Sequence, residues 1–154
     1  MRPTFLVRPA GAHDASVITD FNLRLAWETE HLRLDPEVVR RGVGRVLAEA
    51  GLGRYFVAED GGRVVGQCSI TYEWSDWRDG IWWWLQSVYV EGEARGAGAF
   101  RSLFEHVAGE ARLAGALGLR LYVEQDNRVA QEVYARRGMQ RTPYQVYEWV
   151  IPRA

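Results

Sequence analysis

The stretch from residue 54 to residue 90 constrains the fold more than any other part of the chain. It holds three apolar runs, RYFVAED, RVVGQCSITYEW and IWWWLQSVYV, which cover residues 54–60, 63–74 and 81–90. Short turns separate the runs: the pair Gly61-Gly62, and then SDWRDG at residues 75–80. Apolar runs of this length joined by such short turns predict an antiparallel meander of three strands.

The chain before the meander predicts one strand and two helices. The strand covers Thr4 to Arg8 and stops at Pro9. Asp14 can cap a first helix, whose apolar residues have helical spacing at Val17, Ile18, Phe21 and Leu25. The second helix has Asp35 as N-cap and Pro36 at its first position, with a buried face of Val39, Val43, Val46 and Leu47. Residues 27–34 form a polar-aromatic link between these two helices.

After the meander, a glycine-containing loop opens a long helix with apolar positions Phe100, Leu103, Phe104, Val107, Ala111 and Ala114. A strand at 119–124, a short helix at 127–137 that Gly138 ends, and a last strand from Tyr144 to Ile151 follow. The predicted order is β-α-α-β-β-β-α-β-α-β. Because residues 81–124 form a strand-helix-strand unit, they require a parallel pair beside the antiparallel meander. We therefore expect an α/β fold, with a mixed central β-sheet and helices on both faces, in one domain over residues 1–154.

Composition excludes several classes of function. The formal net charge is −1 and the pI is near 6.3, so no global positive field favours nucleic acid. No apolar run approaches the roughly 20 residues that cross a bilayer, and the first residues do not resemble a signal peptide, so a cytoplasmic protein without membrane contact is expected. The lone cysteine, Cys68, excludes an internal disulfide, and the three histidines lack metal-ligand spacing. No metal is predicted.

The loop Arg95-Gly96-Ala97-Gly98-Ala99-Phe100 lies between a predicted strand and a helix. Glycines let backbone N–H groups approach a ligand closely, and a helix N-terminus suits a pyrophosphate. Arg95 and Arg101 add positive charge. A tight turn that only begins the helix would show the same pattern, so this loop alone does not decide the function. A dinucleotide fingerprint would need a third glycine where Arg101 stands.

A second motif lies at residues 127–139, NRVAQEVYARRGM, where Asn127, Ala130, Tyr134 and Gly138 form the pattern N-x-x-A-x-x-x-Y-x-x-x-G. With both motifs in place, the chain resembles the GNAT superfamily of N-acetyltransferases, whose first motif is Q/R-x-x-G-x-G/A. The element order is similar to that fold over essentially all 154 residues. The sixth position of the first motif departs from the pattern, since it is Phe100, which we expect to point into the helix–sheet core. The stretch TYEWSDWRDGIWWWLQSVYV is similar to a bacterial branch that has no clearly assigned acceptor.

The resemblance implies acetyl-coenzyme A (acetyl-CoA) as co-substrate and no metal. It implies that the strand around Val88 offers its backbone to the pantetheine arm, with an N–H near Val88 polarising the thioester carbonyl. Tyr134 would protonate the leaving thiolate, about 2 kcal/mol uphill for a tyrosine and a thiol of ordinary pKa. A core tyrosine at 134 and a helix N-cap at 127 are the plainer alternatives. The implied cofactor-binding residues are Val88, Tyr89, Val90, Arg95, Gly96, Ala97, Gly98, Ala99, Phe100, Arg101, Asn127, Ala130 and Tyr134.

The acceptor is predicted to be a primary amine. A lysine-like amine needs about 4–5 kcal/mol to lose its proton at pH 7, so a general base or a water relay is expected. In some family members a glutamate on the fourth strand is the base, but the comparable position here is Trp84. Strand alternation places four residues on one face, Trp82, Trp84, Gln86 and Val88. The candidate bases, and with them the candidate acceptor-binding carboxylates, are Glu28, Glu30, Glu73 and Asp76, although solvated surface carboxylates would show the same pattern. The tryptophans together with Glu28 and Glu30 would favour a cationic amine, but tryptophans packed in the core or at a homodimer seam are an equally good interpretation.

Three functions fit these residues. The first is an N-acetyltransferase for a small-molecule amine, the second an N-acetyltransferase for proteins or peptides, and the third a non-catalytic acyl-CoA-binding sensor or dimerisation module. Cys68 lies mid-strand among apolar neighbours and is expected to be a buried hydrophobe rather than a nucleophile. Direct transfer in a ternary complex is therefore predicted.

Overall fold

The computed structural model describes residues 5–153 and divides the chain into two compact units, Met1–Leu121 and Tyr122–Ala154. Thr4, the predicted start of the first strand, lies outside the described residues. The first unit contains β1 (Leu6–Pro9), α1 (Ala15–Glu30), α2 (Pro36–Ala48), β2 (Arg54–Asp60), β3 (Arg63–Ser75), β4 (Gly80–Val90), α3 (Ala99–Leu113) and β5 (Gly118–Arg120). Short 3₁₀ turns precede α1 and α3, at Ala12–Asp14 and Gly92–Ala94. The second unit contains α4 (Arg128–Arg136).

The sheet of the first unit has five strands in the order β1-β2-β3-β4-β5. Neighbouring strands are antiparallel from β1 through β4, whereas β4 and β5 are parallel because α3 lies between them in the chain. The predicted mixed α/β sheet is therefore confirmed, including the three-strand meander of β2, β3 and β4.

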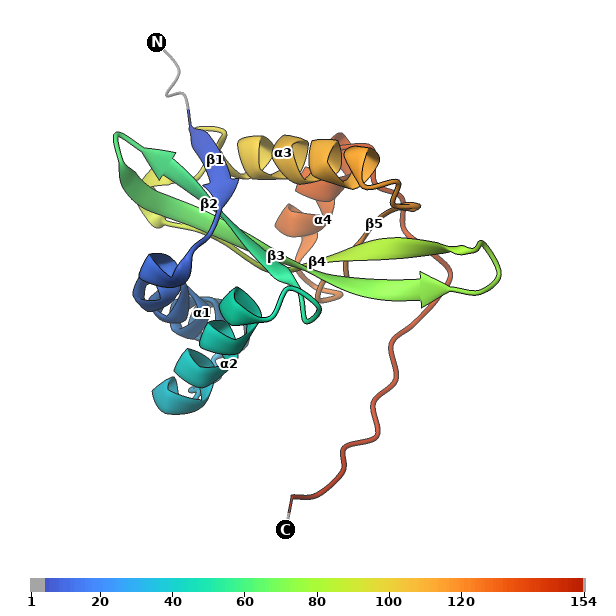
Figure 1. The fold of residues 1–154 in the computed structure, drawn as a ribbon, viewed down its shortest axis with the longest axis horizontal. Coiled ribbons are helices and arrows are strands. Elements are labelled where there is room, and N and C mark those ends of the chain that lie inside the picture. Colours follow the sequence, from blue (N-terminus) through green and yellow to red (C-terminus); the bar gives the residue numbers. More distant parts are fainter. Residues whose placement is uncertain (1–4, 154) are drawn as a thin grey trace. The chain divides into compact units, whose positions relative to one another are not determined.

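Helices cover both faces of this sheet (Figure 1), with α3 on one face and α1 and α2 on the other. The α3 face buries the larger core, to which α3 contributes Ala99, Leu103, Val107 and Ala111. Full burial of a side chain such as Leu103 contributes about 1.5–3 kcal/mol to stability. The opposite face buries a smaller cluster formed by Ile18, Val43, Tyr55 and Val57. Phe100 was expected in the helix–sheet core, but it is half-buried and contacts Phe104 at a ring distance of 6.1 Å.

The two helix starts follow different rules. Asp35 caps α2 as predicted, because its Oδ1 accepts a hydrogen bond from the Glu37 amide at 2.9 Å. Asp14 precedes α1 but makes no cap bond. Its carboxylate instead accepts from the Arg8 Nη1 at 2.7 Å and from the Gly11 amide at 2.8 Å. The predicted cap bond is therefore wrong, because a guanidinium on β1 is a stronger partner for that carboxylate.

Helix α1 is longer than predicted. It continues through the expected link to Glu30 and ends at His31, which adopts a left-handed φ of 52°. No proline or glycine lies between Leu25 and His31, so nothing in the local sequence stops the helix earlier. Glu28 and Glu30 therefore lie on the last turn of α1 rather than in a loop.

The second unit confirms its helix but not its strand. Asn127 caps α4, since its Oδ1 accepts from the Ala130 amide at 3.1 Å, and Gly138 ends the helix region with a φ of 86°. β5 stops at Arg120, so the strand predicted for 119–124 is shorter than expected. The last strand predicted for Tyr144–Ile151 is wrong: within residues 139–153 none is assigned to a strand. Alternating apolar residues form a strand only where a ladder partner pairs with them, and this segment has none among the residues that the structure describes.

Candidate active site

A β-bulge interrupts β4 three residues before its end. Gln67 on β3 pairs with Tyr89, and Ser69 pairs with Gln86, so the single residue Cys68 lies opposite both Ser87 and Val88. Ser87 takes up the extra length with a left-handed φ of 49°. For a non-glycine residue this conformation costs about 1 kcal/mol or more.

The bulge reverses which residues of β4, odd-numbered or even-numbered, face α3. Before it, Trp83 and Leu85 belong to the core beneath α3, and after it Val88 and Val90 pack against that same core. Tyr89 faces α1, where its ring lies 5.0 Å from that of Phe21. Val88 was predicted to share a face with Trp82, Trp84 and Gln86, and this is wrong because strict alternation ends at the bulge.

The bulged end of β4 is paired on one side only within the first unit. The parallel ladder to β5 runs over three residue pairs and stops at Trp84 and Arg120. From Leu85 to Val90, β4 pairs with β3 alone in that unit. The edge of β4 that faces away from β3 therefore has no ladder partner in the first unit from Val88 to Val90, and it leads directly into the predicted phosphate loop.

Two glycines shape that loop. Gly96 and Gly98 have φ values of 76° and 109°, and Gly98 is the N-cap of α3. Among the described residues no side chain caps α3, so its first-turn amides point at the space in front of the loop. A Cβ added at either glycine would meet no described atom within 4 Å, so the space directly over both glycines is open. Backbone donors, a helix N-terminus and open space together suit an anionic group such as a diphosphate.

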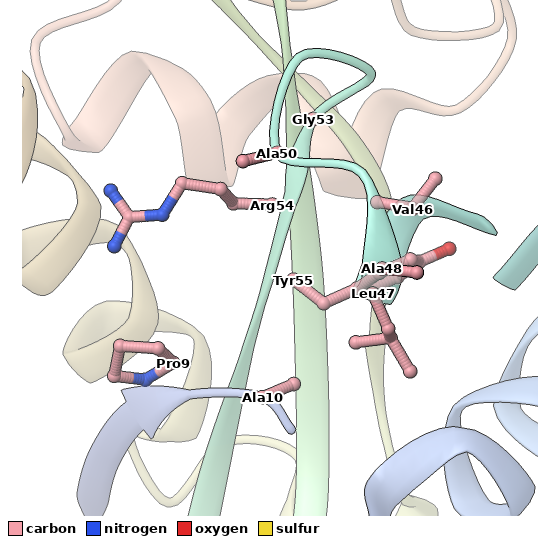
Figure 2. Close-up of a pocket in the computed structure, with 9 residues that line it drawn as sticks. All are labelled: Pro9, Ala10, Val46, Leu47, Ala48, Ala50, Gly53, Arg54 and Tyr55. Atoms are coloured by element: carbon pink, nitrogen blue, oxygen red, sulfur yellow. The ribbon is translucent and has the colours of Figure 1, made fainter. Parts of the chain in front are cut away.

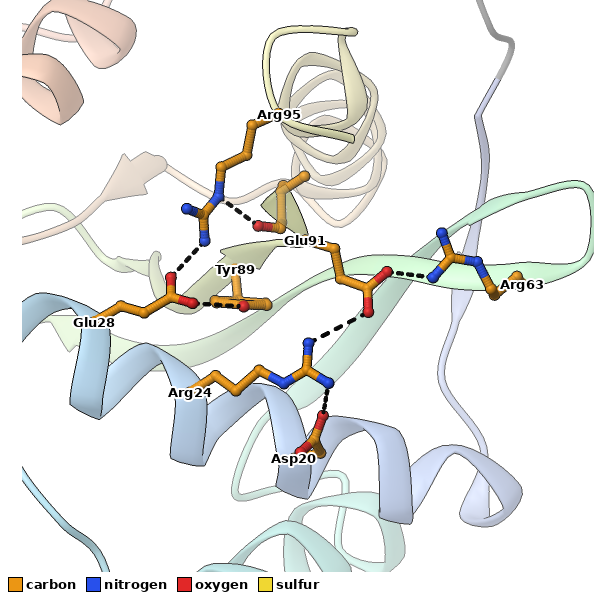
Figure 3. A network of polar contacts seen from close by, with 8 residues as sticks. Asp20, Arg24, Glu28, Arg63, Tyr89, Glu91 and Arg95 are labelled. Atoms are coloured by element: carbon orange, nitrogen blue, oxygen red, sulfur yellow. Dashed lines mark hydrogen bonds and ion pairs between the residues drawn. The ribbon is translucent and has the colours of Figure 1, made fainter. Parts of the chain in front are cut away.

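A network of charged side chains joins α1 to this loop (Figure 3). The Arg95 guanidinium donates to the Val90 carbonyl at 2.8 Å and pairs with Glu28 at 2.5 Å. Glu28 also accepts from the Tyr89 hydroxyl at 3.0 Å. The Arg95 guanidinium, with the Tyr89 hydroxyl assisting, holds the pKa of Glu28 below its usual value. Glu28 is therefore a weaker general base than an unpaired glutamate, since a base acts best with a pKa near the working pH.

A second part of the network lies beside the first. Arg24 on α1 pairs with Asp20 at 2.7 Å and with Glu91 at 3.4 Å, and Glu91 also pairs with Arg63. Exposed pairs of this kind contribute about 0–1 kcal/mol each. Their main effect is on geometry, because the two arginines together hold Glu91, the residue at which β4 passes into the loop.

The predicted acceptor residues on β4 already have partners. The guanidinium of Arg120 lies 4.0 Å from the ring centroid of Trp82. Arg120 also donates to Glu73 at 2.7 Å, and the same Glu73 oxygen accepts from the Trp84 indole at 3.2 Å. The cation over the Trp82 ring is thus Arg120 of the protein itself, and the same guanidinium compensates the charge of Glu73. Gln86 donates to the Thr71 hydroxyl at 2.7 Å.

Other predicted residues lie elsewhere. Glu30 is exposed at the end of α1, and Asp76 accepts from the Trp77 amide in the β3–β4 turn. Of the five clustered tryptophans, only Trp83 is buried in the core, whereas Trp77 is 87% exposed. Arg101 pairs with Glu105 on α3 at 2.7 Å.

Cys68 is fully buried on β3, and burial raises the pKa of its thiol to about 12. A thiol that stays protonated and has no access to solvent is a poor nucleophile. Within residues 5–153, no cluster of three or more histidine, cysteine, aspartate or glutamate side chains is placed to hold a metal ion. None of the helices in that range combines the length and apolar character that a bilayer crossing requires.

A hollow of about 140 Å³ lies away from these residues, between the end of β1, the end of α2 and the start of β2 (Figure 2). None of the predicted site residues lines it. Its wall is mostly aliphatic: Pro9, Ala10, Val46, Leu47, Ala48, Ala50, Gly53, Arg54 and Tyr55.

In the second unit, α4 carries Ala130 and Tyr134 one turn apart, on the same side of the helix. Burial raises the pKa of the Tyr134 hydroxyl above its usual value, so the phenol is protonated at neutral pH. The N-cap bond of Asn127 leaves its Nδ2 donors available for a second role.

Comparison with known proteins decides the family. The sequence model of the acetyltransferase (GNAT) family matches residues 48–139. The crystal structure of a possible acetyltransferase from Clostridium difficile 630 is 38% identical, with a TM-score of 0.90 over 97% of this chain and 99% of that one. The chain belongs to the acetyltransferase (GNAT) family. No protein of curated function matches the sequence significantly.

Two more distant acetyltransferase structures share the fold alone. A predicted acetyltransferase from Clostridium acetobutylicum, solved with acetyl-CoA, is 18% identical with a TM-score of 0.77, covering 94% of this chain and 96% of that one. Glucosamine-6-phosphate N-acetyltransferase from Arabidopsis thaliana is 19% identical with a TM-score of 0.71, covering 95% and 98%. The GNAT assignment agrees with the resemblance that the two sequence motifs carried, and it confirms the predicted fold class.

Sequence reasoning missed the bulge and the polar residues behind it. Gln67 is completely buried on β3 and donates to the carbonyl of Ser87 at 3.2 Å and to Asn22 at 2.8 Å. One signal was present, because Gln67 is the only strongly polar residue in the apolar run VVGQCSI. A buried amide in such a run needs hydrogen-bond partners and so indicates a specific structural task.

Proposed function

We propose that this GNAT protein transfers the acetyl group of acetyl-CoA to a primary amine of a small molecule, by direct transfer in a ternary complex. The main support is the juxtaposition in the first unit of a one-sided strand end with an open, glycine-shaped helix start. The fold shared with a protein solved with acetyl-CoA adds weight.

The chain's residues fit the cofactor. The amides at Gly96, Gly98 and the first turn of α3 would bind the pyrophosphate, and the open space in front of both glycines accommodates it. The outward main-chain groups of Val88 to Val90, other than the Val90 carbonyl that Arg95 binds, would pair with the amides of the pantetheine arm. Asn127 and Ala130 on α4 would complete the binding of that arm.

The reaction forms a C–N bond and breaks the C–S bond of the thioester, for which acetyl-CoA supplies the activated acyl group. The Val88 N–H would stabilise the negative charge that develops on the carbonyl oxygen. Tyr134 would donate its proton to the sulfur as the thiolate leaves, and its raised pKa keeps the phenol protonated until then. The protonated amine loses two protons: one before it attacks, which goes to solvent, and one from the newly acylated nitrogen, which restores the Tyr134 phenol. Because Glu28 and Glu73 are both ion-paired, we assign both protons to a water relay rather than to either carboxylate.

We further propose that residues 1–154 act as a single N-acetyltransferase domain. The phosphate loop lies in the first unit and the Asn–Tyr helix in the second, and the family model spans both from residue 48 to residue 139. Neither unit alone holds both motifs.

A thiol-release assay with acetyl-CoA and a panel of amines tests the proposal. Tyr134→Phe should lower kcat about 10²- to 10⁴-fold, the usual contribution of a positioned acid, while the affinity for coenzyme A stays near the wild-type value. Tyr144→Phe is the matched control, because this phenol lies in the same unit and is 75% exposed. Failure of the wild-type protein to bind coenzyme A in calorimetry would refute the proposal. Binding without turnover on any amine would indicate the sensor, and turnover confined to peptides would indicate a protein N-acetyltransferase.

A further inference from the structure

Gln67 is a buried polar side chain in the mostly apolar part of β3. Its side chain is completely inaccessible, between Gly66 and Cys68 on β3. Burying a primary amide is unfavourable unless its polar groups are paired. Here the Nε2 group is paired twice, with the Ser87 carbonyl at 3.2 Å and with the Asn22 Oδ1 at 2.8 Å, whereas the Oε1 atom has no partner among the described residues. An apolar side chain at this position would avoid the cost of the unpaired Oε1, so stability alone does not account for a glutamine here.

The Gln67 amide is held in turn from two other elements. Asn22 on α1 accepts from Gln67 and donates its own Nδ2 to the Tyr55 hydroxyl on β2 at 3.0 Å. Tyr55 is itself buried. The chain of polar contacts therefore begins on β2, crosses α1 and β3, and ends at the bulge carbonyl of β4.

The bond to the Ser87 carbonyl fixes more than one atom. The peptide unit between Ser87 and Val88 is planar and trans, so its N–H points opposite to its C=O. Because Gln67 draws the Ser87 carbonyl toward β3, the Val88 N–H must point away from β3. That is the side on which the β5 ladder has already ended.

We propose that Gln67, oriented by Asn22, is a positioning residue that aims the Val88 N–H at the thioester carbonyl oxygen. This inference rests on the proposed function, in which that N–H stabilises the developing oxyanion. Gln67 touches neither substrate and acts through the Ser87–Val88 peptide. It also explains why a strained serine is kept at the bulge, since the bond from Gln67 compensates for its left-handed φ of 49°.

The test compares Gln67→Met with Ser69→Ala. Methionine keeps the length of the side chain and removes both donated bonds. Ser69 is the matched control, because this buried residue on β3 donates to the β4 carbonyl before the bulge, that of Gln86, at 3.2 Å and does not contact the Ser87–Val88 peptide that carries the proposed donor. Gln67→Met should lower kcat for acetyl transfer about 10- to 100-fold, since small misplacement of an oxyanion donor has effects of this size. Coenzyme A has no thioester carbonyl, so its Kd in calorimetry should change less than threefold, and Ser69→Ala should leave both values near wild type.

Asn22→Leu provides a second variant should Gln67→Met fail to fold. It keeps Gln67 but removes the oxygen that orients it, so kcat should fall in the same direction by a smaller factor. An active wild-type enzyme whose Gln67→Met and Asn22→Leu variants keep its kcat would overturn the inference and leave the proposed function intact. So would an equal fall of kcat in Ser69→Ala. A wild-type protein without any acetyl transfer would instead refute the proposed function, and with it this role for Gln67.

Discussion

Replacement of Gly98 by alanine tests whether this glycine only shapes the start of α3 or also makes room for a ligand. Gly98 is the N-cap of α3 with a φ of 109°, and a Cβ at this position would contact nothing within 4 Å. In the free protein, Gly98→Ala therefore introduces backbone strain and no steric clash. That strain is about 1–2 kcal/mol, which for a chain of this size lowers Tm by roughly 2–8 °C.

The effect on coenzyme A should be larger than the strain alone. If the pyrophosphate lies against this turn, the new methyl group occupies its space and displaces it from at least one backbone donor. A hydrogen bond to a charged group contributes about 1.5–3 kcal/mol, so the Kd should rise roughly 10- to 150-fold. Isothermal titration calorimetry with coenzyme A measures this directly, and a thermal melt of each variant measures the strain.

Gly115→Ala is the control. This glycine follows the C-terminal end of the same helix, with a φ of 70°, and its Cβ would also contact nothing within 4 Å. The 15 residues of α3 place it about 20 Å from the loop. Gly115→Ala should therefore lower Tm by a similar amount and leave the Kd unchanged. Equal Kd values for the two variants would refute the reasoning that the start of α3 binds the diphosphate.

Two further predictions concern groups away from the loop. The Arg8 guanidinium lowers the pKa of the buried Asp14, so this pair stabilises the protein above the ordinary aspartate pKa of about 4 and loses its effect as pH falls through the lowered value. Because Arg8 keeps its ion pair with Glu59, Asp14→Asn should cost about 1–3 kcal/mol at pH 7, and urea titrations should show this difference shrinking below pH 4; a constant difference would contradict the assignment. Cys68, with a thiol pKa of about 12, should not carry the acyl group, so Cys68→Ala should keep the wild-type kcat and sequential kinetics, and a ping-pong pattern would exclude direct transfer.

Local signals explain which parts of the fold the sequence predicted. β2 begins and ends at the predicted residues 54 and 60, and β3 and β4 differ from their predicted ends by one residue each at most. Gly61-Gly62 and the 75–80 turn are local features, so the chain marks these boundaries without reference to anything distant. The cap at Asp35, the cap that the sequence left as one alternative for Asn127, and the left-handed Gly138 after α4 are local in the same sense, and the structure has all three.

Features that depend on distant partners were missed or wrong. Arg95 and Glu28 are 67 positions apart, and each was assigned to a different ligand because no local pattern indicates that they pair. Asp14 was predicted to cap the helix that follows it, whereas its carboxylate binds Arg8 on β1. The segment 144–151 alternates like a strand, but a strand also needs a ladder partner, which periodicity does not supply.

The bulge on β4 is stabilised by packing on both faces of the strand, because no local sequence feature favours a left-handed Ser87. Without it, Val88 would turn toward α1 and Tyr89 toward α3, because a shift of one residue moves every following side chain to the opposite face. On the α3 face, Val88 and Val90 pack against a core that holds the completely buried Leu103 and Val107, and a close-packed core opposes the exchange of a valine for a larger phenol ring. On the α1 side, Tyr89 would lose both the Phe21 ring and the Glu28 carboxylate. A regular strand would thus lose packing on both faces, and this loss is larger than the backbone strain at Ser87.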